Sequence, residues 1–447
     1  MSSVFDMQLP PTWASAPLKH VVTKLHRGSA PTYVDDGPVR AISQAANQAS
    51  GLDWSRTRYH DFLGDPTRLK GYLHPCDVLV NSTGTGTLGR VGYFVSPSDG
   101  IPCMADSHVT IVRPNSSGLD SRFAFYWLGS QPFQEYIFAA LVVGATNQIE
   151  LNRDRLGEAP VPLPPLSEQR RIADFLDVET ALIDRLVSAR EKQVEVLDEC
   201  EYAEVTDGLI PGSLDSPSGE WPWIWLPAPV DDAPLVRLGY VARLQSGLTV
   251  DGKRDLSGDV VTRPYLRVAN VQADRIQVDD VSEITVPANI AKRSTLLAGD
   301  VLMTEGGDLD KLGRGTVWRG ELERCLHQNH VFAVRPDGLR LDAEYLSLMT
   351  RTVHGRCYFE STGVKTTNLA STNSSKILGF PIPLPSLEIQ RLRVHTVQRK
   401  LDGSARAKQC LRAQLELLGE RRQALITAAV TGQLDVTTSR PAHDRDL

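Results

Sequence analysis

The sequence has no long hydrophobic run and no paired cysteines. Its longest uncharged apolar stretch, around residues 137–145, is far shorter than the roughly 20 residues that a membrane-spanning helix needs. The six cysteines stand singly, without a C-x-x-C pair, so neither a zinc ribbon nor a disulfide framework is indicated. The first residues lack a basic start followed by an apolar block. We therefore expect a cytoplasmic protein with reduced thiols.

Catalytic motifs are also missing. The sequence contains no G-x-x-x-x-G-K-[ST], no Asn-Pro-Pro-Tyr or Asp-Pro-Pro-Tyr block, no H-E-x-x-H and no G-x-S-x-G. These motifs would supply a nucleotide, an amino-methyltransferase, a zinc or a serine-hydrolase site. We therefore expect a non-enzymatic chain with no metal or cofactor of its own.

The charge is distributed unevenly along the chain. Its 48 basic and 54 acidic residues give a net charge of -6, which by itself does not indicate nucleic acid. By segment, residues 1–160 carry -1, 161–215 carry -8, 216–380 carry -1 and 381–447 carry +4. Two nearly neutral segments thus alternate with two shorter ones of opposite sign, and such a difference favours pairing of the short segments.

The chain is a tandem repeat with an offset near 222 residues. C-M-A-D-S-H-V-T-I-V-R-P at residues 103–114 matches C-L-H-Q-N-H-V-F-A-V-R-P at residues 325–336 in Cys, His, both Val, Arg and Pro. V-P-L-P-P-L-S-E-Q-R at residues 161–170 matches I-P-L-P-S-L-E-I-Q-R at residues 382–391. Each repeat is a β-rich segment punctuated by Pro and Gly, followed by a long Pro-free run.

The Pro-free runs predict two coiled-coil helices, since apolar residues recur in steps of three and four. At about 1.5 Å rise per residue, 35 to 40 residues would form a spacer of roughly 50 to 60 Å. An alternative is that each apolar stripe simply packs on its own globular segment. The stripe residues are Ile172, Leu176, Ile183, Leu186 and Leu197 in the first run and Val394, Val397, Leu401, Leu411, Leu415, Leu418 and Leu425 in the second.

The sequence thus predicts an α/β fold (mixed α+β), with two similar domains in tandem, two long antiparallel helices and a pseudo-two-fold relation. We expect the first domain at residues 1–160, the first helix at 161–210, the second domain at 211–380, the second helix at 381–432 and a flexible tail at 433–447.

These features resemble the specificity (S) subunit of type I restriction-modification enzymes, over nearly the whole chain. The resemblance depends on L-P-P-T-W at residues 9–13, G-T-G-T-L-G-R at 84–90, Tyr265-Leu266-Arg267 with Asn270, and both P-L-P-x-L-x-x-Q-R blocks. It implies two target-recognition domains that each read half of a split, asymmetric DNA sequence. The two helices would separate these domains. The Trp-rich segment at residues 221–225 departs from the pattern and leaves the start of the second domain open.

The resemblance also implies partners: double-stranded DNA, two methyltransferase subunits seated on the helices, and restriction and translocation subunits. S-adenosylmethionine, ATP and Mg would belong to those partners, and the system would methylate DNA and defend against phage. Two other functions stay open. One is a single-chain DNA methyltransferase or nuclease with an unrecognised site, and the other is a two-headed scaffold that binds only proteins.

Basic, amide and hydroxyl residues near expected loops are the candidate DNA contacts. Arginine can bind guanine with two hydrogen bonds and asparagine can bind adenine, while lysine more often contacts phosphate. For any one of the basic or amide residues, a solvated surface charge is the more common interpretation. The candidates are Arg40, Arg56, Arg58, Lys70, Ser82, Thr83, Thr85 and Arg90 in the first domain and Lys253, Arg254, Arg267, Asn270, Lys292, Arg293, Lys311 and Arg314 in the second.

Two further features of the sequence are given a structural interpretation. G-T-G-T-L-G at residues 84–89 has the spacing of a dinucleotide-binding loop, but β-prone residues follow it where that loop requires a helix. We interpret it as a hairpin loop that either presents donors to DNA or only connects strands. The repeated His108, His330, Arg113 and Arg335 are interpreted as scaffold.

Overall fold

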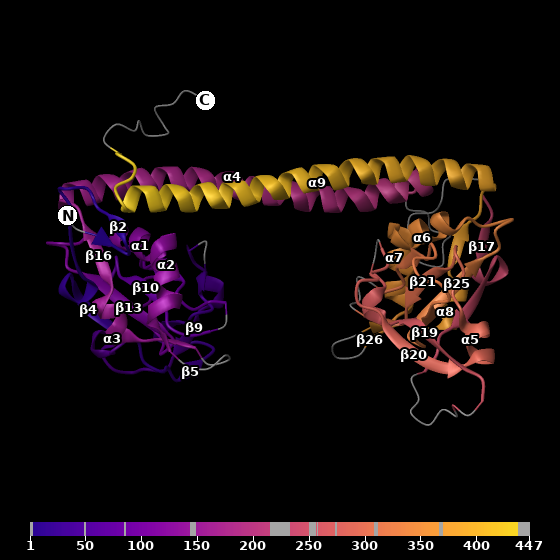
Figure 1. Cartoon of the computed structure of the whole chain (residues 1–447), viewed down its shortest axis with the longest axis horizontal. Helices are drawn as coiled ribbons and strands as arrows, with labels where there is room; N and C mark the ends of the chain where they lie inside the picture. Colours follow the sequence, from indigo (N-terminus) through magenta and orange to yellow (C-terminus); the bar gives the residue numbers. More distant parts are fainter. Residues whose placement is uncertain are drawn as a thin grey trace. The chain divides into compact units, whose positions relative to one another are not determined.

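The protein is described by a computed structural model (Figure 1). The structure describes residues 3–48, 51–84, 86–143, 149–214, 233–249, 256, 258–272, 275–307, 312–365 and 370–436. Its contacts divide the chain into unit 1, formed by Met1–Glu191 and Arg412–Leu447, and unit 2, formed by Lys192–Leu411. Each unit combines one globular head with parts of two long helices. We call residues 3–163 head 1 and residues 233–384 head 2.

Head 1 is built on two small sheets. One is antiparallel, with the strand order β11-β10-β13-β4. The other has the order β12-β6-β9-β5, in which β12 and β6 are parallel. The strands are β4 (Val22–Arg27), β5 (Tyr33–Val34), β6 (Val39–Ile42), β9 (Arg58–His60), β10 (Val78–Asn81), β11 (Val91–Tyr93), β12 (Cys103–Ala105) and β13 (Val109–Pro114).

Head 2 repeats this topology. Its antiparallel sheet has the order β18-β25-β21-β23, the same neighbours as in head 1, and its second sheet, β20-β19-β24, again contains one parallel pair. The predicted duplication and the mixed α/β class are therefore confirmed. The strands are β18 (Ala242–Ser246), β19 (Val260–Leu266), β20 (Ser282–Pro287), β21 (Val301–Thr304), β23 (Gly315–Val317), β24 (Leu326–His327) and β25 (Val331–Pro336).

Most helices pack beside the antiparallel sheet at matching places in the two heads (Figure 1), whereas the helix at Ala288–Ser294 packs on the second sheet of head 2. Asp120 and Asp342 begin α1 and α6, because each carboxylate accepts two backbone N–H groups of the first turn. The helices are α1 (Ser121–Gly129), α2 (Gln131–Tyr136) and α3 (Arg153–Glu158) in head 1, and α5 (Ala288–Ser294), α6 (Ala343–Arg351), α7 (Val353–Thr362) and α8 (Ser374–Gly379) in head 2.

Short elements complete both heads. The strand that precedes each long helix pairs with the strand that enters the head, β16 with β3 and β28 with β17. These and the remaining strands are β1 (Ser3–Val4), β2 (Met7–Gln8), β3 (Ala14–Pro17), β7 (Asn47–Gln48), β8 (Gly51–Leu52), β14 (Val142–Val143), β15 (Glu150–Leu151), β16 (Pro160–Leu163), β17 (Leu235–Arg237), β22 (Gly306–Gly307), β26 (Val364–Lys365), β27 (Ala370–Ser371) and β28 (Pro381–Pro383).

Two long helices, α4 (Leu166–Leu209) and α9 (Leu387–Val430), follow the heads. Each has 44 residues and is about 66 Å long at 1.5 Å per residue. Within unit 1, Arg422 of α9 pairs with Asp184 of α4, and within unit 2, Lys408 pairs with Asp198 while Ser404 donates to Glu201. The residue numbers rise on one helix as they fall on the other, so the helices run antiparallel in unit 2.

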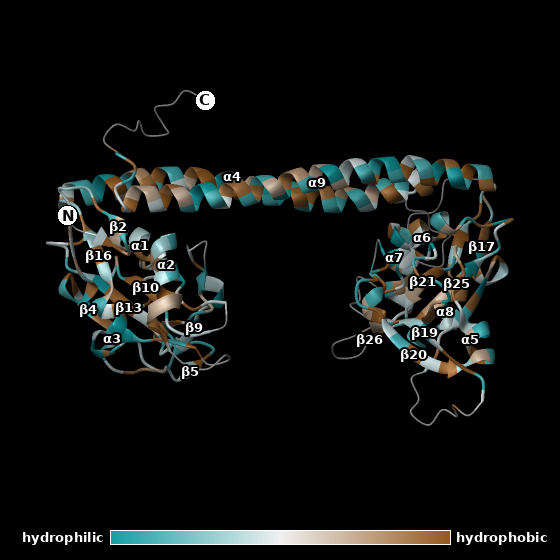
Figure 2. Cartoon of the chain, in the orientation of Figure 1, coloured by the Kyte–Doolittle hydropathy of each residue, from teal (hydrophilic) through white to brown (hydrophobic). Residues whose placement is uncertain are grey.

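The apolar stripe is buried only in part. Ile172, Leu176, Ile183, Val394 and Val397 are buried, whereas Leu197, Leu401, Leu411, Leu415, Leu418 and Leu425 are half-buried. Leu186 is 41% exposed, so its assignment to the packed stripe is wrong. Two paired helices cover a narrow seam, and a side chain at its edge stays in contact with water. Figure 2 shows apolar and polar residues alternating along both helices.

Polar residues that interrupt the stripe are paired between the helices. The ammonium of Lys408 lies 2.8 Å from Asp198 and 2.6 Å from Glu201. Burial opposes its charge, but the hydrogen bonds to both carboxylates raise the pKa of Lys408 above its ordinary value. The expected charge complementarity of the two runs is thus confirmed within unit 2.

The contact units differ from the serial division expected from the sequence. The division falls inside both helices, at Glu191/Lys192 and Leu411/Arg412, rather than at their ends. Each head therefore includes the adjoining helix ends in its core: Ile172 and Ile426 pack in head 1, and Val205 and Val397 pack in head 2. The Trp-rich segment at residues 221–225 lies outside the described residues.

A turn before β21 provides a test of backbone strain. Gly299 has a φ of +93°, and its counterpart before β10 is Cys76, with a φ of +72°. A β-carbon at Gly299 would meet no atom within 4 Å, so Gly299→Ala tests the backbone alone. We expect it to destabilise head 2 by about 1 to 2 kcal/mol, the cost of a left-handed L-residue. Gly118→Ala, equally open but without a positive φ, is the control, and equal denaturation midpoints would contradict the expectation.

Candidate nucleic-acid interface

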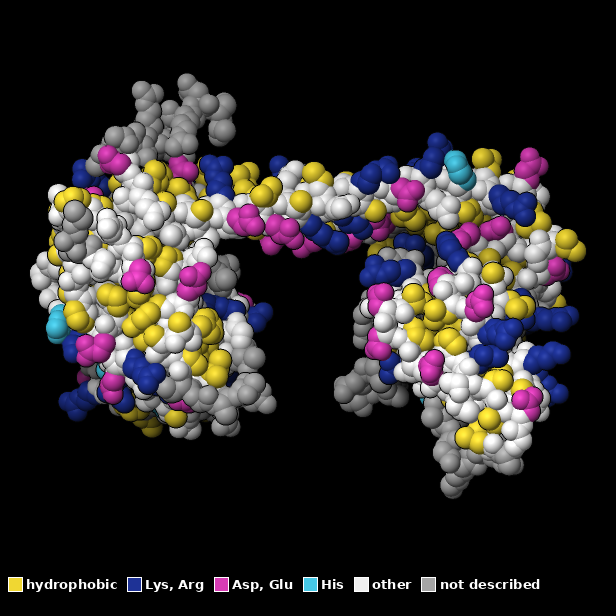
Figure 3. Space-filling view, viewed as in Figure 1, with side chains coloured by type: hydrophobic (Ala, Val, Ile, Leu, Met, Phe, Trp, Pro, Cys, Tyr) yellow, Lys and Arg dark blue, Asp and Glu magenta, His cyan; other side chains and the backbone are white. Residues whose placement is uncertain are grey.

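The candidate residues of head 1 gather mainly along β6 and β9. In the view of Figure 3, Lys and Arg side chains lie on both heads among acidic ones. Arg56 is exposed and pairs with Asp53 at 2.9 Å, and Arg58 lies across the sheet from Ala41, next to Arg40. Lys70 is exposed elsewhere, in the segment before β10.

Arg40 is engaged inside the head. Its guanidinium donates to Thr57 at 3.0 Å and to the Tyr59 hydroxyl at 3.2 Å, and it forms an ion pair with Asp99. The ring of Tyr59 lies 5.1 Å from its guanidinium carbon. With only 11% of the side chain exposed, Arg40 orders its neighbours and has little surface to offer DNA.

Arg58 is better placed than Arg40 to contact DNA. It is exposed, and its guanidinium carbon lies 4.0 Å from the centre of the Tyr33 ring. Stacking uses the flat face of the guanidinium and leaves its N–H edges for other groups. Tyr33 is held by Asp106, to which its hydroxyl donates at 3.3 Å. Burial, followed by the charge of Asp106, raises the pKa of Tyr33 to about 12, so Tyr33 stays neutral.

The glycine loop after β10 is fixed from within the head. Ser82 is completely buried, with its hydroxyl 2.5 Å from that of Thr110, so its proposed role as a DNA contact is wrong for this conformation. Thr83 donates to Gln44 at 3.1 Å and lies 2.8 Å from the His108 ring nitrogen. Arg90 donates to the Asn47 carbonyl and to Gln48. Strand β11, not a helix, follows the loop, as its β-prone residues predicted. Thr85 lies outside the described residues.

Fewer candidates can be placed in head 2. Asn270 is buried, and its amide group serves the backbone: it accepts from Arg267 and donates to the carbonyls of Gln277 and Asp280. Its assignment as a base contact is therefore wrong, because the side chain is buried and both of its N–H donors are already bonded to backbone carbonyls. Arg314 donates to the Tyr202 hydroxyl at 3.1 Å. Lys292, Arg293 and Arg267 are exposed, and Lys253, Arg254 and Lys311 lie outside the described residues.

The repeated residues have matching structural roles, as expected for scaffold. Arg113 binds both oxygens of the buried Asp77, at 2.6 and 2.7 Å, and Arg335 binds Asp300 at the same two distances. His108 meets Thr83 in the loop of head 1, and the His330 ring lies 2.5 Å from Glu305 in head 2. The duplicated pattern in the sequence therefore corresponds to duplicated ion pairs within the two heads.

The glutamine of each P-L-P-x-L-x-x-Q-R block joins a head to its long helix. The buried Gln169 accepts from the Asp120 backbone N–H at 2.8 Å and donates to the carbonyls of Gly118 and Pro164. Gln390 makes the same three kinds of hydrogen bond in head 2, accepting from Asp342 at 2.9 Å. The motif thus fixes where each helix starts relative to its own head.

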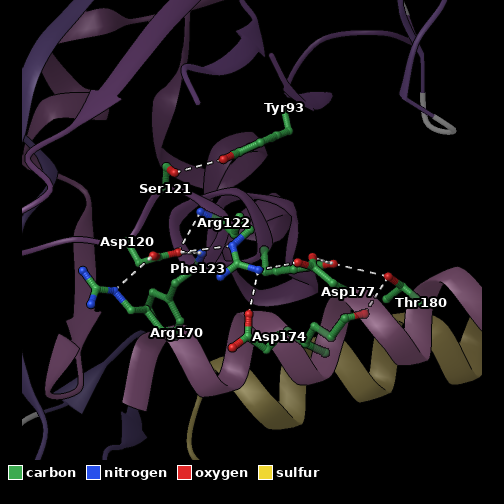
Figure 4. A network of polar contacts seen from close by, with 11 residues as sticks. Tyr93, Asp120, Ser121, Arg122, Phe123, Arg170, Asp174, Asp177 and Thr180 are labelled. Atoms are coloured by element: carbon green, nitrogen blue, oxygen red, sulfur yellow. Dashed lines mark hydrogen bonds and ion pairs between the residues drawn. The ribbon is translucent and has the colours of Figure 1, made fainter. Parts of the chain in front are cut away.

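Head 1 is tied to α4 by a further polar network (Figure 4). Arg122 lies 2.8 Å from Asp174 and 2.7 Å from Asp177. In head 2 the counterpart of Arg122 is Glu344, two residues after the capping aspartate, and Glu344 pairs with Arg319 of its own head at 2.6 Å. The contacts of Arg122 with Asp174 and Asp177 are therefore specific to head 1, whereas the pair between Asp120 and Arg170 recurs in head 2 as Asp342 and Arg391.

The sequence reasoning missed a second group of cations. Lys24 of β4 and Arg113 of β13 lie opposite each other, and Arg243 of β18 and Arg335 of β25 do so in head 2. An alignment of the two repeats that matches Lys24 with Arg243 would have shown that both heads carry a cation at this position. In the part of the chain that the structure describes, no group of three or more His, Cys, Asp or Glu side chains could hold a metal ion. The described helices include none that could cross a membrane.

Comparison with known proteins shows what the chain resembles. A family model for the type I restriction modification DNA specificity domain matches residues 65–196. The EcoKI specificity subunit of Escherichia coli (strain K12) is 23% identical over 98% of this chain and 92% of its own length. The StySPI specificity subunit of Salmonella potsdam is 21% identical over the same shares.

One solved structure, described as the "structural basis underlying complex assembly and conformational transition of the type I R-M system", shares the fold. Its TM-score is 0.66, at 17% identity over 96% of this chain and all of that one.

Proposed function

Because the chain belongs to the specificity-subunit family of type I restriction-modification systems, we propose that it recognises a two-part DNA sequence, one part with each head. The observation that carries this proposal is the pair of heads with one topology and unlike exposed residues. Heads of one fold can approach DNA alike, whereas unlike side chains read different bases.

The partners follow from the same family. We propose that two methyltransferase subunits bind the long helices, and that restriction and translocation subunits join them in the cytoplasm. S-adenosylmethionine, ATP and Mg would bind to those subunits, and the methylated base would be flipped into a methyltransferase pocket. The chain itself acts by recognition and not by catalysis. The relatives' names support neither a single-chain methyltransferase nor a nuclease.

Methylation sequencing tests the proposal. In cells that carry the complete system, we expect modified bases within a two-part motif with a fixed unread gap, and we expect them to disappear when the gene for this chain is deleted. A methylation pattern that survives the deletion, or an uninterrupted motif, would contradict the proposal. The purified chain should show no methyl transfer or cleavage on its own.

Arg58 is our candidate for reading a base in head 1. We expect Arg58→Ala to weaken binding to the target duplex by about 5- to 150-fold, the worth of one two-pronged base contact, with little effect on a scrambled duplex. Fluorescence anisotropy of the complex with its methyltransferase measures both affinities. Arg153→Ala is the control, because Arg153 is exposed and pairs only locally, with Asp154 at 2.6 Å. Equal losses on both duplexes would remove Arg58 from the base-reading role.

A further inference from the structure

A group of cations surrounds the buried ion pair in head 1. Lys24 and Arg113 both donate to the Tyr72 carbonyl, at 3.4 and 3.3 Å, so their positive ends lie close together. Lys70 is two residues before Tyr72, and His26 and His74 lie in the same neighbourhood. Asp77 supplies a negative charge, but Arg113 occupies both of its oxygens.

The charges in this group repel one another. Burial lowers the pKa of Lys24 and the charge of Arg113 lowers it further, while the charge of Asp77 partly opposes the decrease. Burial also lowers the pKa of His26, and Lys24, Lys70 and Arg113 add to the decrease. The pKa of His74 is lowered by burial and by Arg113 and Lys24, against an opposing effect of Asp77. A bound anion would relieve this repulsion, so the group is suited to a negatively charged ligand.

Head 2 carries the same charges in the same register. Arg243 faces Arg335 across β18 and β25 as Lys24 faces Arg113 across β4 and β13. Arg335 binds the buried Asp300. Arg293 corresponds to Lys70, because Leu296 and Leu73, three residues later in each repeat, donate to the equivalent carbonyls of Cys325 and Cys103.

The surface of head 2 is hollowed beside Arg243 and Arg335. A pocket of about 490 Å³ is lined by Arg243, Arg335 and Asp337 together with the backbone around Tyr240. The pocket also contains the carboxylate of Asp337. One of its oxygens accepts a hydrogen bond from the Leu339 backbone N–H at 3.1 Å. Arg243 is exposed and Arg335 is 37% exposed, so both can meet a ligand from outside.

The cations that occur in both heads differ in kind from the residues that occur in only one head. Lysine in head 1 becomes arginine in head 2 at two positions, so the charge is kept while the side chain changes. By contrast, the strand registers place Pro264 and Ser282 of head 2 at the positions of Arg40 and Arg58. Shared charge suits the phosphates, which are alike in every DNA sequence, whereas unlike side chains suit the bases.

We infer that a duplicated cation triad, Lys24, Lys70 and Arg113 in head 1 and Arg243, Arg293 and Arg335 in head 2, binds phosphates of the DNA backbone at both half-sites. This inference rests on the proposed function and adds the element that positions each head on the duplex. Arg113 and Arg335 also hold the fold through Asp77 and Asp300, so Lys24 and Arg243 are the residues to change.

The test measures DNA binding by the complex with its methyltransferase, using one target duplex and one scrambled duplex at several salt concentrations. Each phosphate contact contributes about 0.9 to the salt slope, or about eightfold in affinity at 0.1 M salt. We expect Lys24→Ala and Arg243→Ala each to weaken both duplexes about eightfold, and the double variant about sixtyfold, with slopes smaller by about 0.9 and 1.8. The ratio between the two duplexes should stay unchanged.

Several variants keep the result interpretable. Lys24→Arg and Arg243→Lys retain the charge and should bind like wild type. Arg153→Ala in head 1 and Arg319→Ala in head 2 should also bind like wild type, because they remove exposed cations that pair within their own heads. Thermal melting checks folding, and Gln replaces Ala wherever an alanine variant does not fold.

Wild-type affinity and slope in the double variant would overturn the inference, as would a loss confined to the target duplex. The proposed function fails separately, if wild type itself does not distinguish the two duplexes. In that case the triad remains testable on the scrambled duplex.

Discussion

Replacing Asp300 by alanine is expected to destabilise head 2 by about 3 to 5 kcal/mol, because it leaves a partly buried guanidinium without its counter-ion. The Asp300 side chain is fully buried, binds Arg335 at 2.6 and 2.7 Å, and accepts the Leu297 backbone N–H at 2.8 Å. Because 37% of the Arg335 side chain is exposed, water can replace part of the lost interaction. The value should therefore lie near the lower end of the range.

Hydrogen exchange measured by mass spectrometry can follow each head separately. We expect faster exchange in β21 and β25, while β10 and β13 of head 1 stay protected. Asp77→Ala should reverse the pattern, since Asp77 makes the same three hydrogen bonds in head 1. Arg319→Ala is the control, because it removes an exposed ion pair worth less than about 1 kcal/mol. Asp300→Ala behaving like Arg319→Ala would show that the buried pair is not important for stability.

Exchanging residues 17–160 for the same segment of a relative is expected to replace one half of the recognised sequence completely and to leave the other half unchanged. The boundaries fall where β3 and β16 pair, Pro17 against Pro160, so both junctions lie at one edge of the head. The heads have separate cores, and a change in one should not alter the bases read by the other. Methylation sequencing of cells with the hybrid system gives both half-sites.

The network in Figure 4 determines how this exchange should be designed. Arg122 lies inside the exchanged segment, whereas Asp174 and Asp177 lie beyond it on α4. A donor without a cation at position 122 would leave Asp174 and Asp177 without the guanidinium that lies between them, so a second hybrid should extend to residue 180. A change in both half-sites in either hybrid would contradict independent reading by the two heads.

Much of the fold could be predicted because the repeat occurs within one sequence. The matching Cys, His, Val, Arg and Pro at residues 103–114 and 325–336 lie on β12–β13 and β24–β25, and both Pro-free runs are helices. The spacing of apolar residues predicts which of them lie on one side of a helix. It does not predict how much of that side the partner helix covers. For that reason the exposure of Leu186 could not be foreseen.

The site was harder to predict, because the role of a polar side chain depends on which backbone groups surround it. Asn270 and Ser82 looked like donors near loops, yet each is buried and bonded within its head. The position of Lys24 beside Arg113 depends on the pairing of strands almost ninety residues apart. Such pairing is not visible in local patterns, although comparison of the two repeats would have shown the shared charge.

The unequal attachment of the two heads limits how such proteins can be recombined. In register with the Gln169 and Gln390 motifs, Asp174 and Asp177 of α4 correspond to His395 and Gln398 of α9. A copy of head 1 moved to the second position would bring Arg122 to a helix without those carboxylates, while a copy of head 2 moved forward would bring Glu344 to two aspartates. Shuffling of heads between the two positions should therefore succeed only when the first turns of the following helix are inherited with them.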